Sequence, residues 1–187
     1  AQILKERPSA KIAVLYQNDD YGKDYLKGLE DGLGDKAKTM IVSKLSYEIS
    51  DPTIDSQIVA LKGTGADVFV NITTPKFAAQ SIRKMAEIGW KPVHYLNSVS
   101  ASVGAVLKPA GLENSVGIIT TLYLKDPTDP MWENDPAFKD WLAFMKKYYP
   151  EGNLADALNV YGYTVAQNLV MVLKACGDNL TRENLMK

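Results

Sequence analysis

The sequence predicts an α/β protein, a three-layer sandwich in which a parallel sheet of about five strands lies between two layers of helices. Short apolar runs alternate along the first two thirds of the chain with longer segments whose apolar residues recur at helical spacing. The apolar runs are nearly continuous, which is typical of strands that are buried on both faces of a parallel sheet. Right-handed connections then place helices on both faces.

Five segments have the pattern of buried strands, because they are rich in β-branched and aromatic residues and are bounded by turn-forming residues. The first and third of them, KIAVLYQ and DVFVNIT, show the pattern most clearly. We expect the strand order 2-1-3-4-5, as in flavodoxin-like sheets. The expected strands are Lys11–Gln17, Thr39–Tyr47, Asp67–Thr73, Val93–Leu96 and Val116–Leu124.

Apolar stripes and end signals indicate the helices between these strands. The helix Gly22–Leu33 carries leucines at helical spacing and is followed by Gly34, a natural stop. Asp51-Pro52 forms a turn before a second helix, whose stripe ends at Leu61. Pro75 takes the favoured first position of a third helix. A serine-rich loop then leads to a short helix near Val103–Leu107.

The pattern changes after Leu124, so we expect two parts, residues 1–124 and 125–187. The second part opens with a proline-containing connecting segment and continues with a helix that starts at Asp135-Pro136 and a long helix, Ala155–Cys176. Ala1–Arg7 has the pattern of the last turns of a helix, and the final helix is cut short soon after its cap. We therefore expect the chain to be a piece of a longer protein.

Composition excludes several classes of function. The chain is 46% hydrophobic and 23% charged with a net charge of −1, and no basic stripe points to a nucleic-acid partner. No apolar run approaches the ~20 residues of a membrane helix. The single cysteine, Cys176, and the single histidine, His94, cannot build a zinc site, and both are expected to be structural. We expect no metal and no cofactor.

Ligands of open parallel sheets bind beyond the carboxyl ends of the strands, so the segments that follow the strands are the candidate site. Helices also begin there, and their free N–H groups favour a carboxylate or another anion. Thr73 and Thr74 are expected to cap the helix that begins at Pro75. If these polar residues only cap helices, however, they never touch a ligand. The candidate ligand-binding residues are Asp20, Tyr21, Thr73, Thr74, Asn97, Ser98, Val99 and Ser100.

The acidic pair Asp19 and Asp20 raises an alternative, because such a pair holds Mg²⁺ in receiver domains of two-component systems. Those domains also need an aspartate at the end of the third strand, where this chain has Asn71-Ile72-Thr73-Thr74. Helix capping explains both aspartates instead. The chain also has no P-loop, no nucleophile elbow and no Ser/His/Asp set, so we expect a binding protein and not an enzyme.

Three stretches carry a resemblance to a known family: KIAVLYQNDDYGKDYLKGLEDGL, GADVFVNITTPKFAAQSIRKMAEIGWKP and KPAGLENSVGIITTLYLKDPTDP. They resemble the second lobe of the branched-chain amino acid (Leu/Ile/Val-binding) family of periplasmic binding proteins, which have the type I fold. The resemblance implies two α/β lobes that close on a solute, with the first lobe preceding Ala1. It also implies that Lys125–Thr128 crosses between the lobes and that Ala155–Cys176 packs on the first lobe. In this chain alone, that helix is then exposed or covered by a second copy.

The resemblance also implies roles for single residues. Tyr21 takes the position of the aromatic residue that lies against the ligand, and Thr73 and Thr74 take the strand-end position that contributes a contact. Val99 stands where the amino-acid binders of the family place a carboxylate for the ligand's ammonium group. A buried ammonium group without a carboxylate partner is costly. The resemblance thus implies an organic or aromatic acid, with an α-amino acid as the alternative if Asp20 is the counter-ion.

The implied function is that of a periplasmic receptor that closes by a hinge and delivers its solute to the permease of a bacterial ABC importer. The same fold also serves as the ligand-sensing domain of regulators and receptors, so a sensory role is the second alternative.

Overall fold

The chain divides into two compact units, Ala1–Leu122 and Tyr123–Lys187. A computed structural model describes every residue from Ala1 to Lys187. The first unit contains the sheet, whereas the second contains helices and loops only. No helix in the structure combines the length and the hydrophobicity that a membrane span requires.

The sheet of the first unit has four strands, all parallel, in the order β2-β1-β3-β4. This confirms the α/β class, the parallel sheet and the predicted order of the first four strands. β1 and β3 lie in the centre and are almost entirely buried, as their continuous apolar runs predict. The strands are β1 (Ile12–Gln17), β2 (Ile41–Tyr47), β3 (Val68–Ile72) and β4 (Val93–Leu96).

The expected fifth strand, Val116–Leu124, is reduced to a single bridge between Ile119 and Tyr95. Two backbone hydrogen bonds form this bridge. The N–H of Ile119 donates to the carbonyl of His94 at 2.8 Å, and the N–H of Leu96 donates to the carbonyl of Ile119 at 2.9 Å. The position beside β4 is the one predicted, but the ladder does not extend. Val116 is 84% exposed, so its side chain has no layer to pack against.

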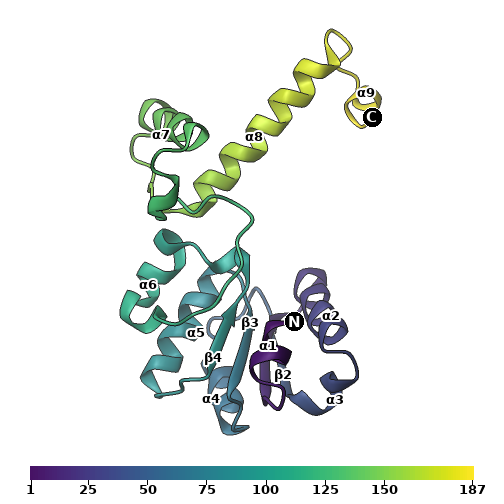
Figure 1. Cartoon of the computed structure of the whole chain (residues 1–187), viewed down its shortest axis with the longest axis vertical. Coiled ribbons are helices and arrows are strands. Elements are labelled where there is room, and N and C mark those ends of the chain that lie inside the picture. The colour runs from purple at the N-terminus through teal and green to yellow at the C-terminus, as the bar shows by residue number, and fades with distance from the viewer. The chain divides into compact units, whose positions relative to one another are not determined.

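Helices cover both faces of the sheet, which makes the first unit a three-layer sandwich (Figure 1). The long helix after β1 begins at Asp20, two residues before the predicted start. The α-helices of this unit are α1 (Gln2–Glu6), α2 (Asp20–Leu33), α3 (Ala37–Met40), α4 (Asp55–Gly63), α5 (Pro75–Glu87) and α6 (Lys108–Ala110). Short turns of 3-10 or π helix are Gly34–Lys36, Ser98–Ser100, Val103–Leu107 and Leu112–Ser115.

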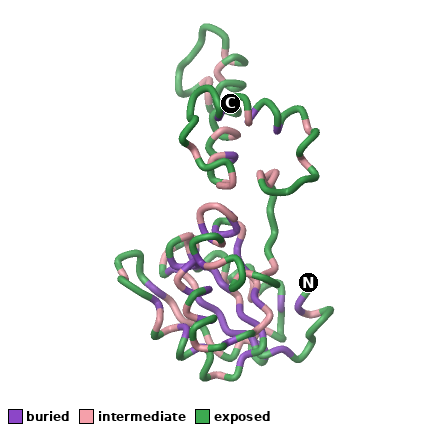
Figure 2. Tube along the Cα trace, turned by 90° about the vertical axis from the view of Figure 1, so that its left-hand side faces the viewer, coloured by how far each residue is buried: buried purple, intermediate pink, exposed green.

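Alternation along the strands divides the core of the first unit between the two faces. Ala13 and Leu15 of β1 pack with residues of α4 and α5, whereas Ile12 and Val14 pack on the side of α2. All four side chains are 0% exposed. Figure 2 shows the buried residues gathered along the strands of this unit.

The second unit has a small core where two helices meet. Its elements are α7 (Pro136–Tyr148), α8 (Ala157–Cys176), α9 (Arg182–Leu185) and a 3-10 turn at Pro130–Trp132. Phe138, Trp141 and Met145 of α7 pack against Val160 of α8. Val160 is the only buried residue of α8, although that helix has 20 residues. Most of the apolar side chains of α8 are therefore exposed.

Candidate functional site

The turn that follows β1 is built by a helix cap. Asp19 is the N-cap residue of α2, and its side chain accepts a hydrogen bond from the N–H of Gly22 at 3.0 Å. The Gln17 amide also donates to Asp19 at 2.5 Å. These bonds lower the pKa of the Asp19 carboxyl below its usual value. Asp19 is thus a structural carboxylate, whereas Asp20 in the next position is exposed.

Gly22 is needed because α2 lies very close to the end of β1. A Cβ atom at this position would lie 1.9 Å from the carbonyl oxygen of Gln17. The chain's own backbone therefore occupies the space that a side chain at position 22 would need.

Gly22→Ala should lower the free energy of unfolding by about 1–3 kcal/mol, because the helix must move away from the strand. Gly28→Ala is the matched control, since nothing lies within 4 Å of a Cβ atom at that position of the same helix. The control should raise the stability by as much as ~1 kcal/mol through helix propensity. Urea denaturation of the two variants measures the difference, and equal stabilities would contradict the close approach.

Two tyrosines connect the start of α2 with the loop after β4. The rings of Tyr21 and Tyr25 are 5.1 Å apart, and the hydroxyl of Tyr25 lies 3.5 Å from that of Ser98. The Tyr21 hydroxyl is buried without a hydrogen-bond partner, and burial raises its pKa above the ordinary value. The structure thus brings Tyr21 and Ser98 to the same edge through Tyr25, which the sequence did not single out.

Thr74 belongs to a second cluster, formed with the ends of β1 and β2. Its backbone N–H donates to the Tyr47 hydroxyl at 3.0 Å, and its own hydroxyl donates to the Gln17 side chain at 3.1 Å. The Tyr47 hydroxyl donates to Gln17 at 3.0 Å. Thr74 is the N-cap residue of α5, as expected, but no side chain forms a cap hydrogen bond there, so capping by the hydroxyls of Thr73 and Thr74 is wrong. The first N–H groups of α5 remain without a side-chain acceptor.

Thr73, Asn97 and Ser100 hold the ends of β3 and β4 together. The carbonyl of Thr73 accepts hydrogen bonds from the Asn97 amide at 2.8 Å and from the Ser100 hydroxyl at 2.5 Å. The Thr73 hydroxyl donates to Asn71 at 2.6 Å. Thr73 and Ser100 are 0% exposed. Their polar groups are already bonded within the fold, whereas the side chain of Val99 is exposed.

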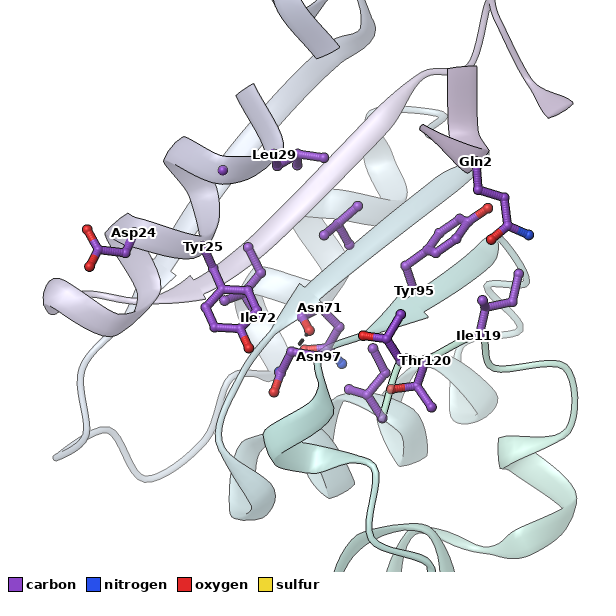
Figure 3. Close-up of a pocket in the computed structure, with 14 residues that line it drawn as sticks. Gln2, Asp24, Tyr25, Leu29, Asn71, Ile72, Tyr95, Asn97, Ile119 and Thr120 are labelled. Atoms are coloured by element: carbon purple, nitrogen blue, oxygen red, sulfur yellow. Dashed lines mark hydrogen bonds between the residues drawn. The ribbon is translucent and has the colours of Figure 1, made fainter. Parts of the chain in front are cut away.

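A pocket of about 730 Å³ lies on the α2 side of β3 and β4 (Figure 3). Asn97 is the only candidate ligand-binding residue that lines it. Tyr25 follows Tyr21 by four residues on the same helix, and Tyr95 precedes Asn97 by two residues. This spacing could have predicted from the sequence that both tyrosines lie near the site. The remaining lining includes Leu29, Val70, Ile72, Ile119, Thr120 and Thr121.

Charge is sparse around this pocket. Asp24 is the only charged residue in its lining. At the neighbouring end of β3, the exposed Lys76 extends over the ring of Phe77, with Nζ 4.7 Å from the ring centre. Lys76 is therefore a cation beside the start of α5, and Asp24 is the carboxylate of the pocket lining.

Known proteins resemble the chain in sequence and fold. The sequence profile described as periplasmic binding protein matches residues 1–187. The Leu/Ile/Val-binding protein homolog 7 of Brucella suis is 27% identical over 149 residues, which are 79% of this chain and 36% of that protein. The corresponding Brucella abortus protein is 26% identical over the same share of each chain.

Solved structures resemble the fold over 98% of the chain. A substrate-binding periplasmic protein from Ralstonia solanacearum has a TM-score of 0.79 at 23% identity, with 51% of it covered. A branched chain amino acid ABC transporter protein from Thermus thermophilus with bound valine has 0.82 at 14% identity, with 47% covered. A fatty acid ABC transporter substrate-binding protein from Thermomonospora curvata has 0.75 at 24% identity, with 47% covered.

The chain thus spans 36% of the length of the Brucella relatives and about half of the length of these solved structures. Those relatives are named as binding proteins and not as enzymes. The match of the family's profile to the whole of residues 1–187 shows that the chain belongs to the periplasmic binding protein family.

Proposed function

We propose that this chain forms one lobe of a two-lobed receptor, which binds a small organic solute and delivers it to the permease of an ABC importer from the periplasm. The observation that carries the proposal is the meeting of Tyr21, Tyr25 and Ser98 beside an open pocket. These residues come from segments that are far apart in the sequence. They meet at the carboxyl edge of a parallel sheet, where α/β proteins bind ligands.

A binding role fits the chemistry of this edge better than a catalytic one. General acid–base catalysis needs a group that titrates near the working pH and faces the substrate. The only histidine, His94, is buried against Phe69, and burial lowers its pKa to about 3. It is neutral at pH 7, and its ring lies against Phe69, which packs with residues of α4 and α5 on the face of the sheet opposite α2.

We propose a carboxylate or an aromatic acid as the solute. The uncapped start of α5 and the nearby Lys76 favour a negative group, and the paired tyrosines offer aromatic surface. Val99 supplies no carboxylate for an ammonium group. The alternative is a branched-chain or other amino acid, which Asp24 or Asp20 would have to neutralise. The names of the Brucella and Thermus proteins favour this alternative.

A screen of melting temperatures tests the solute class. We expect carboxylates such as 3-phenylpropanoate or 4-methylpentanoate to raise the melting temperature of the two-lobed protein by mass action. Leucine and valine form the amino-acid arm of the screen. A rise with amino acids alone would replace the organic acid by the alternative, and no rise with either class would count against a solute receptor.

Tyr21→Ala should weaken solute binding by about 1–3 kcal/mol, which is roughly tenfold to a hundredfold in affinity. The ring is half-buried at the edge and lies tilted against the ring of Tyr25, so its loss would remove contact area for a solute. Titration calorimetry on the two-lobed protein measures the change. Tyr123→Ala, at an exposed tyrosine outside the edge, is the control. Unchanged affinity in Tyr21→Ala would remove this residue from the site.

We propose that α8 packs on the other lobe and that Lys125–Thr128 crosses between the lobes. Closure is then a hinge motion, and the solute favours it only through contacts that exist in the closed state. The exposed apolar side chains of α8 support this proposal, because such a surface is normally covered by a partner. A second copy of the chain is the other candidate for that cover.

The sensory alternative remains open to a direct test. A transport protein would bind the purified permease of its importer and stimulate solute uptake in vesicles. A sensor would leave uptake unchanged.

A further inference from the structure

The amide group of Asn97 has one possible orientation. Its nitrogen lies 3.1 Å from the carbonyl oxygen of Asn71 and 2.8 Å from that of Thr73. Backbone carbonyls only accept hydrogen bonds, so both contacts require the NH₂ side of the amide. The oxygen Oδ1 must therefore point away from the end of β3.

That oxygen has no partner although it is buried. Asn97 is 7% exposed, and Oδ1 is one of the few buried side-chain atoms in the structure without a hydrogen bond. A buried acceptor left unsatisfied costs about 1–3 kcal/mol. Native proteins satisfy most such atoms, so an exception calls for a group that is supplied from outside the chain.

The surroundings show where such a group would enter. Asn97 lines the pocket of about 730 Å³ between α2 and β4 (Figure 3). Tyr95, two residues earlier on β4, lines the same pocket, and its hydroxyl is likewise buried without a partner. One pocket is thus lined by two residues that each carry a buried polar atom without a partner, and the Asn97 oxygen can only accept.

From this geometry we infer that Asn97 determines the specificity of the site by accepting a hydrogen bond from a donor group of the solute. The inference rests on the proposed function and narrows its solute class. The solute carries a hydroxyl, amide or ammonium donor in addition to its carboxylate. The donor side of the amide is engaged by the backbone of β3.

The test compares acids that differ only in a donor group, bound to the two-lobed protein and measured by titration calorimetry. One series is 4-methylpentanoate, 2-hydroxy-4-methylpentanoate and leucine, and the other is 3-phenylpropanoate and 3-phenyllactate. The members with a donor should bind about tenfold to a hundredfold more tightly than those without. This comparison needs no variant, so it stands even if a substitution at Asn97 prevents folding.

Asn97→Leu should bring the affinity ratio within each series close to one. Ser81→Ala is the control, because it removes a buried polar group of the same network, the Ser81 hydroxyl, on the α5 side of the sheet. It should keep the ratio of the wild type. Equal binding of both members by the wild type, or an unchanged ratio in Asn97→Leu, would overturn the inference and leave the proposed function standing. Failure of every acid to bind would overturn both.

Discussion

Lowering the pH from 7 to 5 should reduce the free energy of unfolding by about 2 kcal/mol through His94 alone. Burial lowers the pKa of this histidine from 6.5 to about 3 in the folded state. The unfolded chain therefore takes up a proton as the pH falls through 6.5, while the native state stays neutral until about pH 3. Stability that is present at neutral pH is lost across this window at about 1.4 kcal/mol per pH unit.

Hydrogen bonds explain why the native state resists protonation. The Ser81 hydroxyl donates to the carbonyl of Ala78, so it must accept from the Asn71 amide nitrogen. The same nitrogen lies 3.1 Å from Nε2 of His94, which is therefore the acceptor of that contact. A proton on Nε2 would point one donor at another. Protonation thus has to break this contact as well as charge a buried ring.

Chemical denaturation at a series of pH values, with His94→Gln as the comparison, isolates this effect. Glutamine keeps a hydrogen-bond acceptor but does not titrate, and carboxylates elsewhere titrate equally in both proteins. The variant should lose about 2 kcal/mol less than the wild type between pH 7 and pH 5. Parallel stability curves for the two proteins would show that His94 is not buried as a neutral group.

The sheet could be predicted from the sequence because the burial of β1 and β3 on both faces leaves a local mark. A continuous apolar run bounded by turn residues has few other interpretations. The segment Val116–Leu124 has a similar composition, yet it forms one bridge. Whether a strand extends depends on a layer that covers it, and the 84% exposure of Val116 shows that this layer is absent here. Local composition carries no information on that point.

The meeting of Tyr21, Thr74 and Ser98 at one edge of the sheet could also be predicted, because the strands are parallel and end at the same edge. Which polar atoms are still free could not be predicted. The Asn97 amide is oriented by carbonyls that lie 24 and 26 positions earlier in the chain. The hydroxyl of Ser100 donates to the carbonyl of Thr73, 27 positions earlier, and the hydroxyl of Thr73 donates to the side chain of Asn71. Such pairings follow from tertiary structure and not from residue type.

The composition of α8 has a consequence for stability that depends on its partner. No charged residue occurs between Ala157 and Leu173, and a helix that is apolar on most sides is normally buried. Here Val165 is 49% exposed, Leu169 54% and Val172 41%, and these residues share one side of the helix by their spacing. The proposed packing of α8 on the other lobe would bury them.

Leu169→Lys should therefore change the free energy of unfolding by different amounts in the 187-residue chain and in the two-lobed protein. In the 187-residue chain the side chain is exposed, so the substitution should change the free energy of unfolding by less than about 0.5 kcal/mol. In the two-lobed protein it would place an unpaired charge in an apolar interface and should cost about 2–5 kcal/mol. Lys174→Glu, about 140° around the helix, is the control that should affect neither protein. Equal effects of Leu169→Lys in both proteins would show that α8 faces water in the complete receptor, and reduced self-association of the chain by this variant would point to a second copy as the cover.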